Sequence, residues 1–202
     1  MEIKELSPGL EDQLAQDMAR ELKAGKVIVS PTDTVYGLLA LASCSECVQR
    51  VFEIKGRDST KPLPLFAENL EAAKEIAEIS PEQEAFLSRV WPGKVTCVLK
   101  SAKEMPKGVS SEGSVALRVP NNPFLVSLLG YLGEPMTATS ANLAGGAEIS
   151  DSSELQTIFE GRIRQPDILI SAGILEPSLP STIVNMRKTP YQVIRQGAVL
   201  IP

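Results

Sequence analysis

The sequence predicts a single α/β domain, residues 1–202, with helices flanking a twisted mixed sheet. The main observation is an alternation along the chain: short β-branched or apolar runs, typical of buried strands, are separated by longer segments with apolar residues at helical spacing. The second observation is size and composition. A chain of 202 residues, 43% hydrophobic and 22% charged, can bury a substantial core. No repeat or linker divides it.

The first third of the chain shows this alternation clearly. A helix is expected over residues 10–24, with Gly25 as its C-cap, because apolar residues lie four apart (Leu10, Leu14, Met18 and Leu22). Val27–Val29 predicts a buried strand, which Pro31 ends because proline has no N–H for the ladder. After a polar turn, Ser43 is expected to begin a second helix, with Glu46 at the capping-box spacing.

The remaining elements follow the same rules. Four more helices are expected: one capped by Asn69, one opening at Ser80 and stopped by Trp91-Pro92-Gly93, and those over 123–132 and 151–159, the last ending at Gly161. Apolar or alternating runs predict the strands, at 63–67, 95–100, 115–119, 135–138, 168–170, 181–185 and 192–195.

Cys44 and Cys47 form a Cys-x-x-Cys pair on the apolar stripe expected for the second helix. A single pair in that position is more often part of a core than a redox or metal site, so the core interpretation is favoured and the other stays the alternative. The chain has three cysteines in all, too few for a disulfide framework. This predicts a reducing, cytoplasmic location.

Several function classes are excluded or disfavoured. The chain has no histidine, which rules out Ser-His-Asp and Cys-His catalysis and the usual zinc sites. A net charge of −5 argues against strong non-specific nucleic-acid binding. No apolar run is long enough to span a membrane, and the N-terminus lacks the form of a signal peptide. No P-loop and no G-x-G-x-x-G after a strand is present.

Polar clusters nevertheless stand at the ends of predicted strands, in segments 30–37, 55–61, 137–142 and 181–182. Hydroxyls, a carboxylate and glycine in such places are typical of ligand sites in α/β proteins. The cations of 55–61 would suit a polyanion such as a triphosphate, and Arg118 and Arg195 add two more. An ordinary turn at 30–37, a solvated loop at 55–61 and an outward-facing Arg118 are the alternatives.

The sequence resembles the YrdC-type family, the L-threonylcarbamoyladenylate synthases of tRNA modification. The matching pieces occur in family order over nearly the whole chain: Pro31-Thr32-Asp33-Thr34-Val35-Tyr36-Gly37-Leu38, Lys55-Gly56-Arg57, Lys61-Pro62-Leu63, Trp91-Pro92-Gly93, Leu117-Arg118-Val119-Pro120, Ser140-Ala141-Asn142, Ser181-Thr182 and Ile194-Arg195-Gln196-Gly197. The resemblance implies the short, single-domain form.

What the resemblance implies is condensation of L-threonine, bicarbonate or CO₂ and ATP to threonylcarbamoyl-AMP and pyrophosphate, for transfer to an adenosine of tRNAs that read ANN codons. Downstream threonylcarbamoyl-transfer proteins would use the product, and contact with tRNA or double-stranded RNA is a further expectation. The residues implied for L-threonine are Thr34, Arg118, Ala138 and Ser181. Those implied for ATP are Lys55, Arg57, Ser114, Ser140, Asn142 and Arg195, with Lys55 and Arg57 as the catalytic pair. Mg²⁺ would arrive with ATP, without dedicated protein ligands.

The residues fit this chemistry, because the nucleophile belongs to the substrate and no catalytic Ser, Cys or His is needed. A strand arginine such as Arg118 can take a carboxylate bidentately. Two positions depart from the family: Phe66 replaces a histidine found in some members, and Lys94 replaces a frequent proline. Asp33 is open to two interpretations, a metal ligand or a cap for nearby amides.

Two other functions are weighed against the synthase. An RNA-binding paralogue without synthase activity is disfavoured by the intact Lys55/Arg57 and Ser140/Asn142 pairs and by the acidic charge. A carbamoyl-transfer module like those of hydrogenase-maturation proteins normally lies within a much longer chain.

Overall fold

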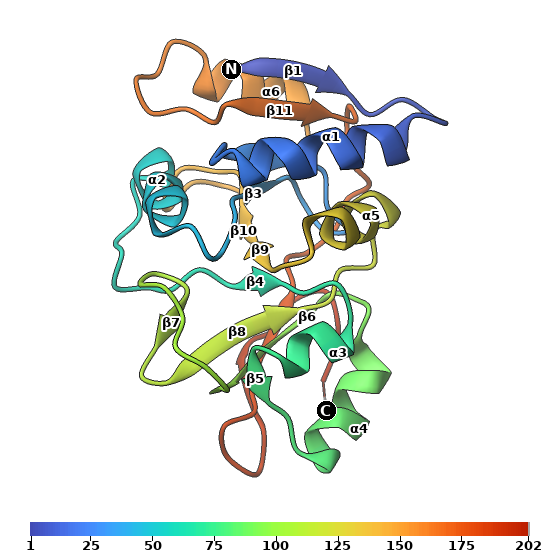
Figure 1. Ribbon diagram of the computed structural model, residues 1–202, viewed down its shortest axis with the longest axis vertical. Coiled ribbons are helices and arrows are strands. Elements are labelled where there is room, and N and C mark those ends of the chain that lie inside the picture. The colour runs from blue at the N-terminus through green and yellow to red at the C-terminus, as the bar shows by residue number, and fades with distance from the viewer. Residues whose placement is uncertain (202) are drawn as a thin grey trace.

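The computed structural model describes residues 1–201, and the structural statements below concern that range (Figure 1). Its helices are α1 (Glu11–Lys23), α2 (Ser45–Lys55), α3 (Leu70–Lys74), α4 (Pro81–Val90), α5 (Pro123–Leu132) and α6 (Ser152–Phe159). Its strands are β1 (Glu2–Glu5), β2 (Ile28–Ser30), β3 (Gly37–Leu39), β4 (Leu65–Phe66), β5 (Ala77–Glu78), β6 (Val95–Ser101), β7 (Ser110–Ser111), β8 (Ser114–Arg118), β9 (Met136–Thr137), β10 (Thr139–Ser140), β11 (Ile168–Ser171), β12 (Thr182–Asn185) and β13 (Gln192–Arg195).

The strands form two mixed sheets, where the sequence led us to expect one. The first has the order β1-β11-β2-β3-β10. The second has the order β13-β12-β6-β8-β4-β9, with β5 added to β6 and β7 to β8. In Figure 1 the first sheet and its helices fill the upper half, and the second sheet, with α3 and α4, fills the lower half. The mixed α/β class is confirmed.

Helices cover both faces of the first sheet. Successive side chains of a strand point to opposite faces, and in these strands both sets are apolar. Ile28, Leu39 and Ile170 pack with the buried stripes of α1 and α5. Their neighbours Val29 and Leu38 point to the other face, where they join a second cluster with α2 and α6. These strands are therefore buried on both sides.

The second sheet is covered on one face only. Cys97, Leu99 and Leu117 are buried and share a cluster with residues of α3 and α4 (Ala73 and Leu87). The alternate residues Val98 and Ala116 are half-exposed. This face of the sheet, which we call the open face, is thus partly exposed, although Thr96 and Arg118 on it are buried.

The two sheets meet at residues 136–140. β9 pairs with β4 in the second sheet and β10 pairs with β3 in the first, and only Ala138 separates them. The Thr137 amide donates to the Ala40 carbonyl at 2.9 Å, which ties β9 to the chain that follows β3. We call residues 136–140 the seam. The polar turn of the first sheet and the end of β8 in the second both lie beside it.

Several expected boundaries are wrong for identifiable reasons. The strand expected at 63–67 shrinks to Leu65–Phe66, because Pro64 interrupts the run and has no N–H to donate. The second helix begins at Ser45, after Cys44 as N-cap, and the expected Ser43–Glu46 capping box is absent from the described hydrogen bonds. The capping boxes or caps expected at Ser80, Asn69 and Asp151 are confirmed.

Candidate functional site

Arg118, the last residue of β8, is the centre of the polar cluster at the seam. Its side chain is only 6% exposed, and it forms an ion pair with Asp33, whose side chain is 7% exposed. Its Nε donates to the Gly93 carbonyl oxygen at 2.9 Å, and its Nη1 lies 3.4 Å from Thr34 Oγ1. The alternative that Arg118 faces outward is therefore wrong.

The turn that carries Asp33 and Thr34 is held by its own side chains. Thr32 Oγ1 accepts from the Thr34 amide at 3.0 Å and donates to the Val35 carbonyl at 2.6 Å. The second oxygen of Asp33 accepts from the Asn121 amide at 3.2 Å. Of the two interpretations left open for Asp33, the structure supports the amide cap and adds a buried ion pair that the sequence did not reveal.

The Trp-Pro-Gly segment supplies the carbonyl that orients Arg118. Trp91 Nε1 donates to the Val95 carbonyl at 2.7 Å, and the Gly93 amide donates to Val119 at 2.9 Å. A Cβ at Gly93 would lie 2.7 Å from the Val90 carbonyl oxygen, so only glycine fits this turn. Lys94, which had no expected role, donates to Ser178 Oγ at 2.8 Å.

A small cavity of about 30 Å³ opens at this point. Its wall includes three residues expected to bind threonine, Thr34, Arg118 and Ala138, together with Ser140. Phe66 also lines it, with its ring 5.5 Å from the Arg118 guanidinium carbon. The aromatic ring at the position of the expected histidine thus packs against the cation instead of donating a hydrogen bond to a ligand.

Lys55 ends α2 and points to the seam from the opposite side. Its buried ammonium donates to the Ser140 carbonyl at 2.5 Å, the Asn142 carbonyl at 2.9 Å and Asn142 Oδ1 at 2.8 Å. Ser140 Oγ donates to the same Asn142 oxygen at 2.7 Å. Burial, reinforced by the nearby charge of Arg57, lowers the pKa of Lys55 to about 8. All three ammonium hydrogens are used in holding residues 140–142.

The side chain of Arg57 has fewer hydrogen bonds than those of Arg118 and Lys55. In the described range, the one hydrogen bond of this side chain is a long contact of 3.4 Å from Nη2 to the Pro62 carbonyl. Within residues 1–201, its Nε is the buried side-chain nitrogen or oxygen atom that lacks a hydrogen-bond partner. Burial also lowers its pKa. A guanidinium left in this state is ready to accept an anionic group.

A third cluster in the second sheet is formed by Ser181, just before β12, and Arg195, the last residue of β13. Arg195 donates to the Ser181 carbonyl from Nη2 at 2.8 Å and from Nε at 3.2 Å. Ser181 Oγ is 2.9 Å from Thr96 Oγ1. A Cβ at Gly197 would lie 2.2 Å from the Pro180 carbonyl oxygen, so this glycine permits the close approach of the two segments. Thr96 is buried here and was not identified from the sequence.

Strand register places these clusters on one face of the second sheet. Arg195 pairs with Ile183, Ile183 with Thr96, and the β6–β8 register puts Thr96 beside Arg118. The two arginines are about three strand spacings, or roughly 14 Å, apart at their Cα atoms. Both belong to the open face, which includes the half-exposed Val98, Ala116 and Ile183.

Ser114 shares this face but is remote from the other residues. It begins β8, about 13 Å along the strand from Arg118, and its Oγ donates to the Ser111 carbonyl at 2.7 Å. The other residues expected in the site, apart from Arg57, belong to the three clusters around Arg118, Lys55 and Arg195. Arg57 follows Lys55 by two positions in the chain.

The surface has a second hollow besides the small cavity at Arg118. A larger hollow of about 610 Å³ lies beside Lys55, Leu143 and the arginines 162 and 164, outside the cluster around Arg118. Of the residues expected in the site, it borders Lys55 alone, whereas the smaller cavity borders Thr34, Arg118, Ala138 and Ser140, so we regard the smaller cavity as the better ligand site. Among the described residues, no group of three or more His, Cys, Asp or Glu side chains could hold a metal ion. No helix in the same range is long and apolar enough to cross a membrane.

Comparison with known proteins identifies relatives of the whole fold. Residues 20–197 match the family Sua5–YciO–YrdC, described as "Telomere recombination". The threonylcarbamoyl-AMP synthase of Pyrococcus abyssi is 31% identical over 88% of this chain and 52% of its own length. The same-named protein of Vibrio vulnificus is 31% identical over 90% of this chain and 97% of its own length. The chain spans about half to two thirds of the longer relatives from Pyrococcus abyssi, Bacillus subtilis and Bos taurus.

Solved structures of related proteins have the same fold. P. abyssi Sua5 in complex with L-threonine superposes with a TM-score of 0.89, at 28% identity, over 98% of this chain and 58% of that one. E. coli YciO superposes with a TM-score of 0.87, at 26% identity, over 98% of this chain and 96% of that one. The similarity therefore covers both sheets and the seam between them.

Proposed function

The chain belongs to the Sua5–YciO–YrdC family, and on that premise we propose that it is an L-threonylcarbamoyladenylate synthase formed by one YrdC-like domain over residues 1–202. In this proposal it condenses L-threonine, bicarbonate or CO₂ and ATP, as a nucleotidyltransferase, and releases pyrophosphate. Relatives across the tree of life carry the name threonylcarbamoyl-AMP synthase. The observation that carries the proposal is the buried Arg118 guanidinium at a small polar cavity in the seam.

The cavity suits the carboxylate of an amino acid. Arg118 has five N–H groups, of which Gly93, Asp33 and Thr34 take three. The remaining N–H groups of Arg118 can bind a carboxylate at the guanidinium end, while Thr34 and Ala138 border the rest of the molecule. Asp33 keeps the guanidinium in one orientation and neutralises it when no ligand is bound. Ser181 is joined to this region through Thr96.

The nucleotide would occupy the open sheet face between Arg57 and Arg195. Arg57 has the unsatisfied guanidinium that a phosphate requires, and Arg195 is fixed by Ser181 at the other side. Lys55 acts through the segment 140–142, which it holds with three hydrogen bonds, so that Ser140 and Asn142 present their polar groups to ATP. Ser114, at the remote end of β8, would reach only the far end of a bound nucleotide.

The chemistry needs alignment more than a protein nucleophile. The threonine amine adds to CO₂ and loses a proton, which gives a carbamate. A carbamate oxygen then attacks the α-phosphorus of ATP, and the bond to the β-phosphate oxygen breaks to release pyrophosphate. Arg57 and Arg195 would neutralise charge on the departing phosphates. Mg²⁺, bound through the phosphates of ATP, would add to that neutralisation.

A pyrophosphate-release assay tests the proposal. Purified protein is supplied with ATP, Mg²⁺ and bicarbonate, with and without L-threonine, and with L-serine as a control. We expect release to depend on threonine. Arg118→Gln should lower kcat/KM for threonine about 100-fold, equivalent to roughly 3 kcal/mol. Arg20→Gln, on the exposed face of α1, is the matched control and should leave the rate unchanged.

The same assay separates the synthase from an RNA-binding paralogue. Threonine-independent or absent turnover, together with RNA binding at moderate salt, would reject the synthase and favour the paralogue. Within the proposal, the product passes to threonylcarbamoyl-transfer proteins that modify tRNA in the cytoplasm, with contact to tRNA or double-stranded RNA as a further part of it.

A further inference from the structure

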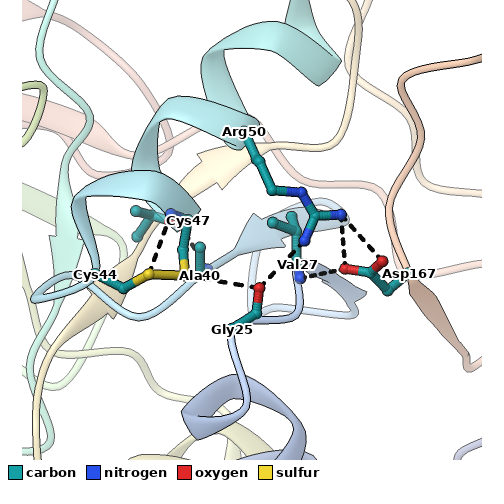
Figure 2. The surroundings of a disulfide bond; sticks show 8 residues. Gly25, Val27, Ala40, Cys44, Cys47, Arg50 and Asp167 are labelled. Atoms are coloured by element: carbon teal, nitrogen blue, oxygen red, sulfur yellow. Dashed lines mark hydrogen bonds and ion pairs between the residues drawn. A yellow bond between two sulfur atoms is a disulfide. The ribbon is translucent and has the colours of Figure 1, made fainter.

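Cys44 and Cys47 form a disulfide at the beginning of α2 (Figure 2). The sequence favoured the pair as part of the core, and the structure places Cys47 in the core with Cys44 packed against it; the bond between them was not predicted. Cys44 stands before the helix as its N-cap, where its Sγ accepts from the Cys47 amide at 3.2 Å. The cysteines are three positions apart in the chain, so one turn of α2 closes the ring.

The two sulfurs have different surroundings. Cys44 is partly exposed, whereas Cys47 is 2% exposed and belongs to the buried stripe of α2. Cys47 Sγ lies 3.6 Å from the carbonyl oxygen of Gly25. The outer sulfur can thus be reached by another thiol, and the inner one cannot.

Polar contacts connect the pair to the chain that leads into the functional site. Arg50, on α2, donates to the Gly25 carbonyl at 3.1 Å and pairs with Asp167 at 2.9 Å. Asp167 in turn accepts from the Val27 amide at 2.7 Å, just before β2. Figure 2 shows Arg50 reaching the Gly25 carbonyl beside Cys47, and Asp167 between Arg50 and Val27. At its other end α2 carries Lys55.

We propose that Cys44 and Cys47 are a reversible thiol–disulfide site, which a dithiol reductant opens by attack at Cys44. Such a pair in a protein of a reducing compartment is typically transient or redox-sensing, not a permanent staple. The site is separate from the proposed synthase chemistry, which uses no sulfur. Its effect is on the stability of the first turn of α2 and of the 25–27 segment packed against it.

Reduction of the disulfide proceeds in two exchange steps. A thiolate of the reductant bonds to Cys44 Sγ, the bond between Cys44 and Cys47 breaks, and Cys47 leaves as a thiolate that takes up a proton. The second thiol of the reductant then attacks its own sulfur in the mixed disulfide, closes a ring and releases Cys44. Two electrons pass from the dithiol to the protein. The oxidised dithiol reverses both steps.

Thiol counting and alkylation test the chemistry. After treatment with excess oxidised glutathione, the denatured protein should contain one free thiol, that of buried Cys97, and after reduced dithiothreitol it should contain three. Brief iodoacetamide treatment of the reduced, folded protein should label Cys44 alone, because burial raises the pKa of Cys97 to about 12 and Cys47 is enclosed. Three thiols under both conditions, or labelling of Cys47 before Cys44, would overturn the proposal.

A stability measurement tests the consequence. Reduction should lower Tm by about 3–8 °C, the size expected for opening a four-residue loop in a chain of this length, and should speed hydrogen exchange in the first turn of α2. The Cys44→Ser/Cys47→Ser protein should melt near the reduced wild type and be insensitive to the reductant. Cys97→Ala should keep the full response. Equal Tm values for the oxidised and reduced wild type would contradict the structural role.

Discussion

Replacement of Asp33 by asparagine tests the buried ion pair on which the site depends. The substitution keeps the shape of the side chain and one acceptor oxygen but removes the charge that faces Arg118. Both side chains are nearly inaccessible, at 6% and 7% exposure, so water cannot replace the lost partner. Arg118 would keep the Gly93 carbonyl and the Phe66 ring. The guanidinium would then be a buried cation without a counter-ion.

The size of the effect follows from these contacts. Breaking a buried ion pair by removing one partner costs about 3–5 kcal/mol. The surviving contacts of Arg118 place Asp33→Asn at the low end, about 3 kcal/mol. For a chain of about 200 residues this corresponds to a Tm lower by roughly 6–12 °C.

Urea and thermal unfolding at pH 7 measure the loss, and a double-mutant cycle assigns it to the pair. The cycle combines Asp33→Asn with Arg118→Gln and should give a coupling energy of about 2 kcal/mol. Glu78→Gln is the matched control, since it breaks the exposed pair with Lys100 and should cost at most about 1 kcal/mol. A loss for Asp33→Asn no larger than the control, with a coupling below about 0.5 kcal/mol, would refute the reasoning.

Three further predictions concern other parts of the site. Lys55 has a pKa of about 8 in the folded protein against 10.5 in the unfolded chain, so the unfolded state binds more protons between those values. This group therefore raises the free energy of unfolding as pH rises from about 8 to 10.5. The rise should disappear in Lys55→Met, which Tm measured against pH would show, and an identical pH profile in both proteins would contradict the prediction. Gly197→Ala places a methyl group against the Pro180 backbone and should cost about 2–3 kcal/mol by urea unfolding, while a change within error would mean that the backbone can yield. Arg57→Ala should raise KM for ATP at least about 10-fold with threonine KM little changed, and a larger effect on threonine would remove Arg57 from the proposed nucleotide site.

The sequence was informative where a local rule decides the structure. Asn69, Ser80 and Asp151 cap helices as their residue types require, and α5 has the expected bounds, 123–132. The polar clusters at strand ends also indicated a shared site, and Thr34, Ala138 and Ser140 line one cavity with Arg118. These successes depend on contacts within a few residues or on motifs that hold their spacing.

What the sequence did not show depends on contacts between distant segments. No residue near Asp33 in the sequence indicates that it pairs with Arg118, 85 positions later. In the same way, nothing around Lys55 indicates that its ammonium donates to the carbonyls of Ser140 and Asn142. The division into two sheets was missed because β9 and β10 form one apolar-to-polar run, and the sheet that each joins is decided by its partner strand. Similarly, the Cys-x-x-Cys spacing allowed both a core pair and a redox or metal site, and did not by itself indicate the disulfide.

The seam has a consequence for how folding and ligand binding are linked. Arg118 and Phe66 come from one sheet, Thr34 from the loop of the other, and Ala138 from the residue that joins them. Neither half alone encloses the cavity, so a molecule that fills it can bind only after the halves have docked. A ligand bound in the cavity therefore opposes separation of the two halves. At saturating ligand the two halves will melt as one cooperative unit, at a higher temperature.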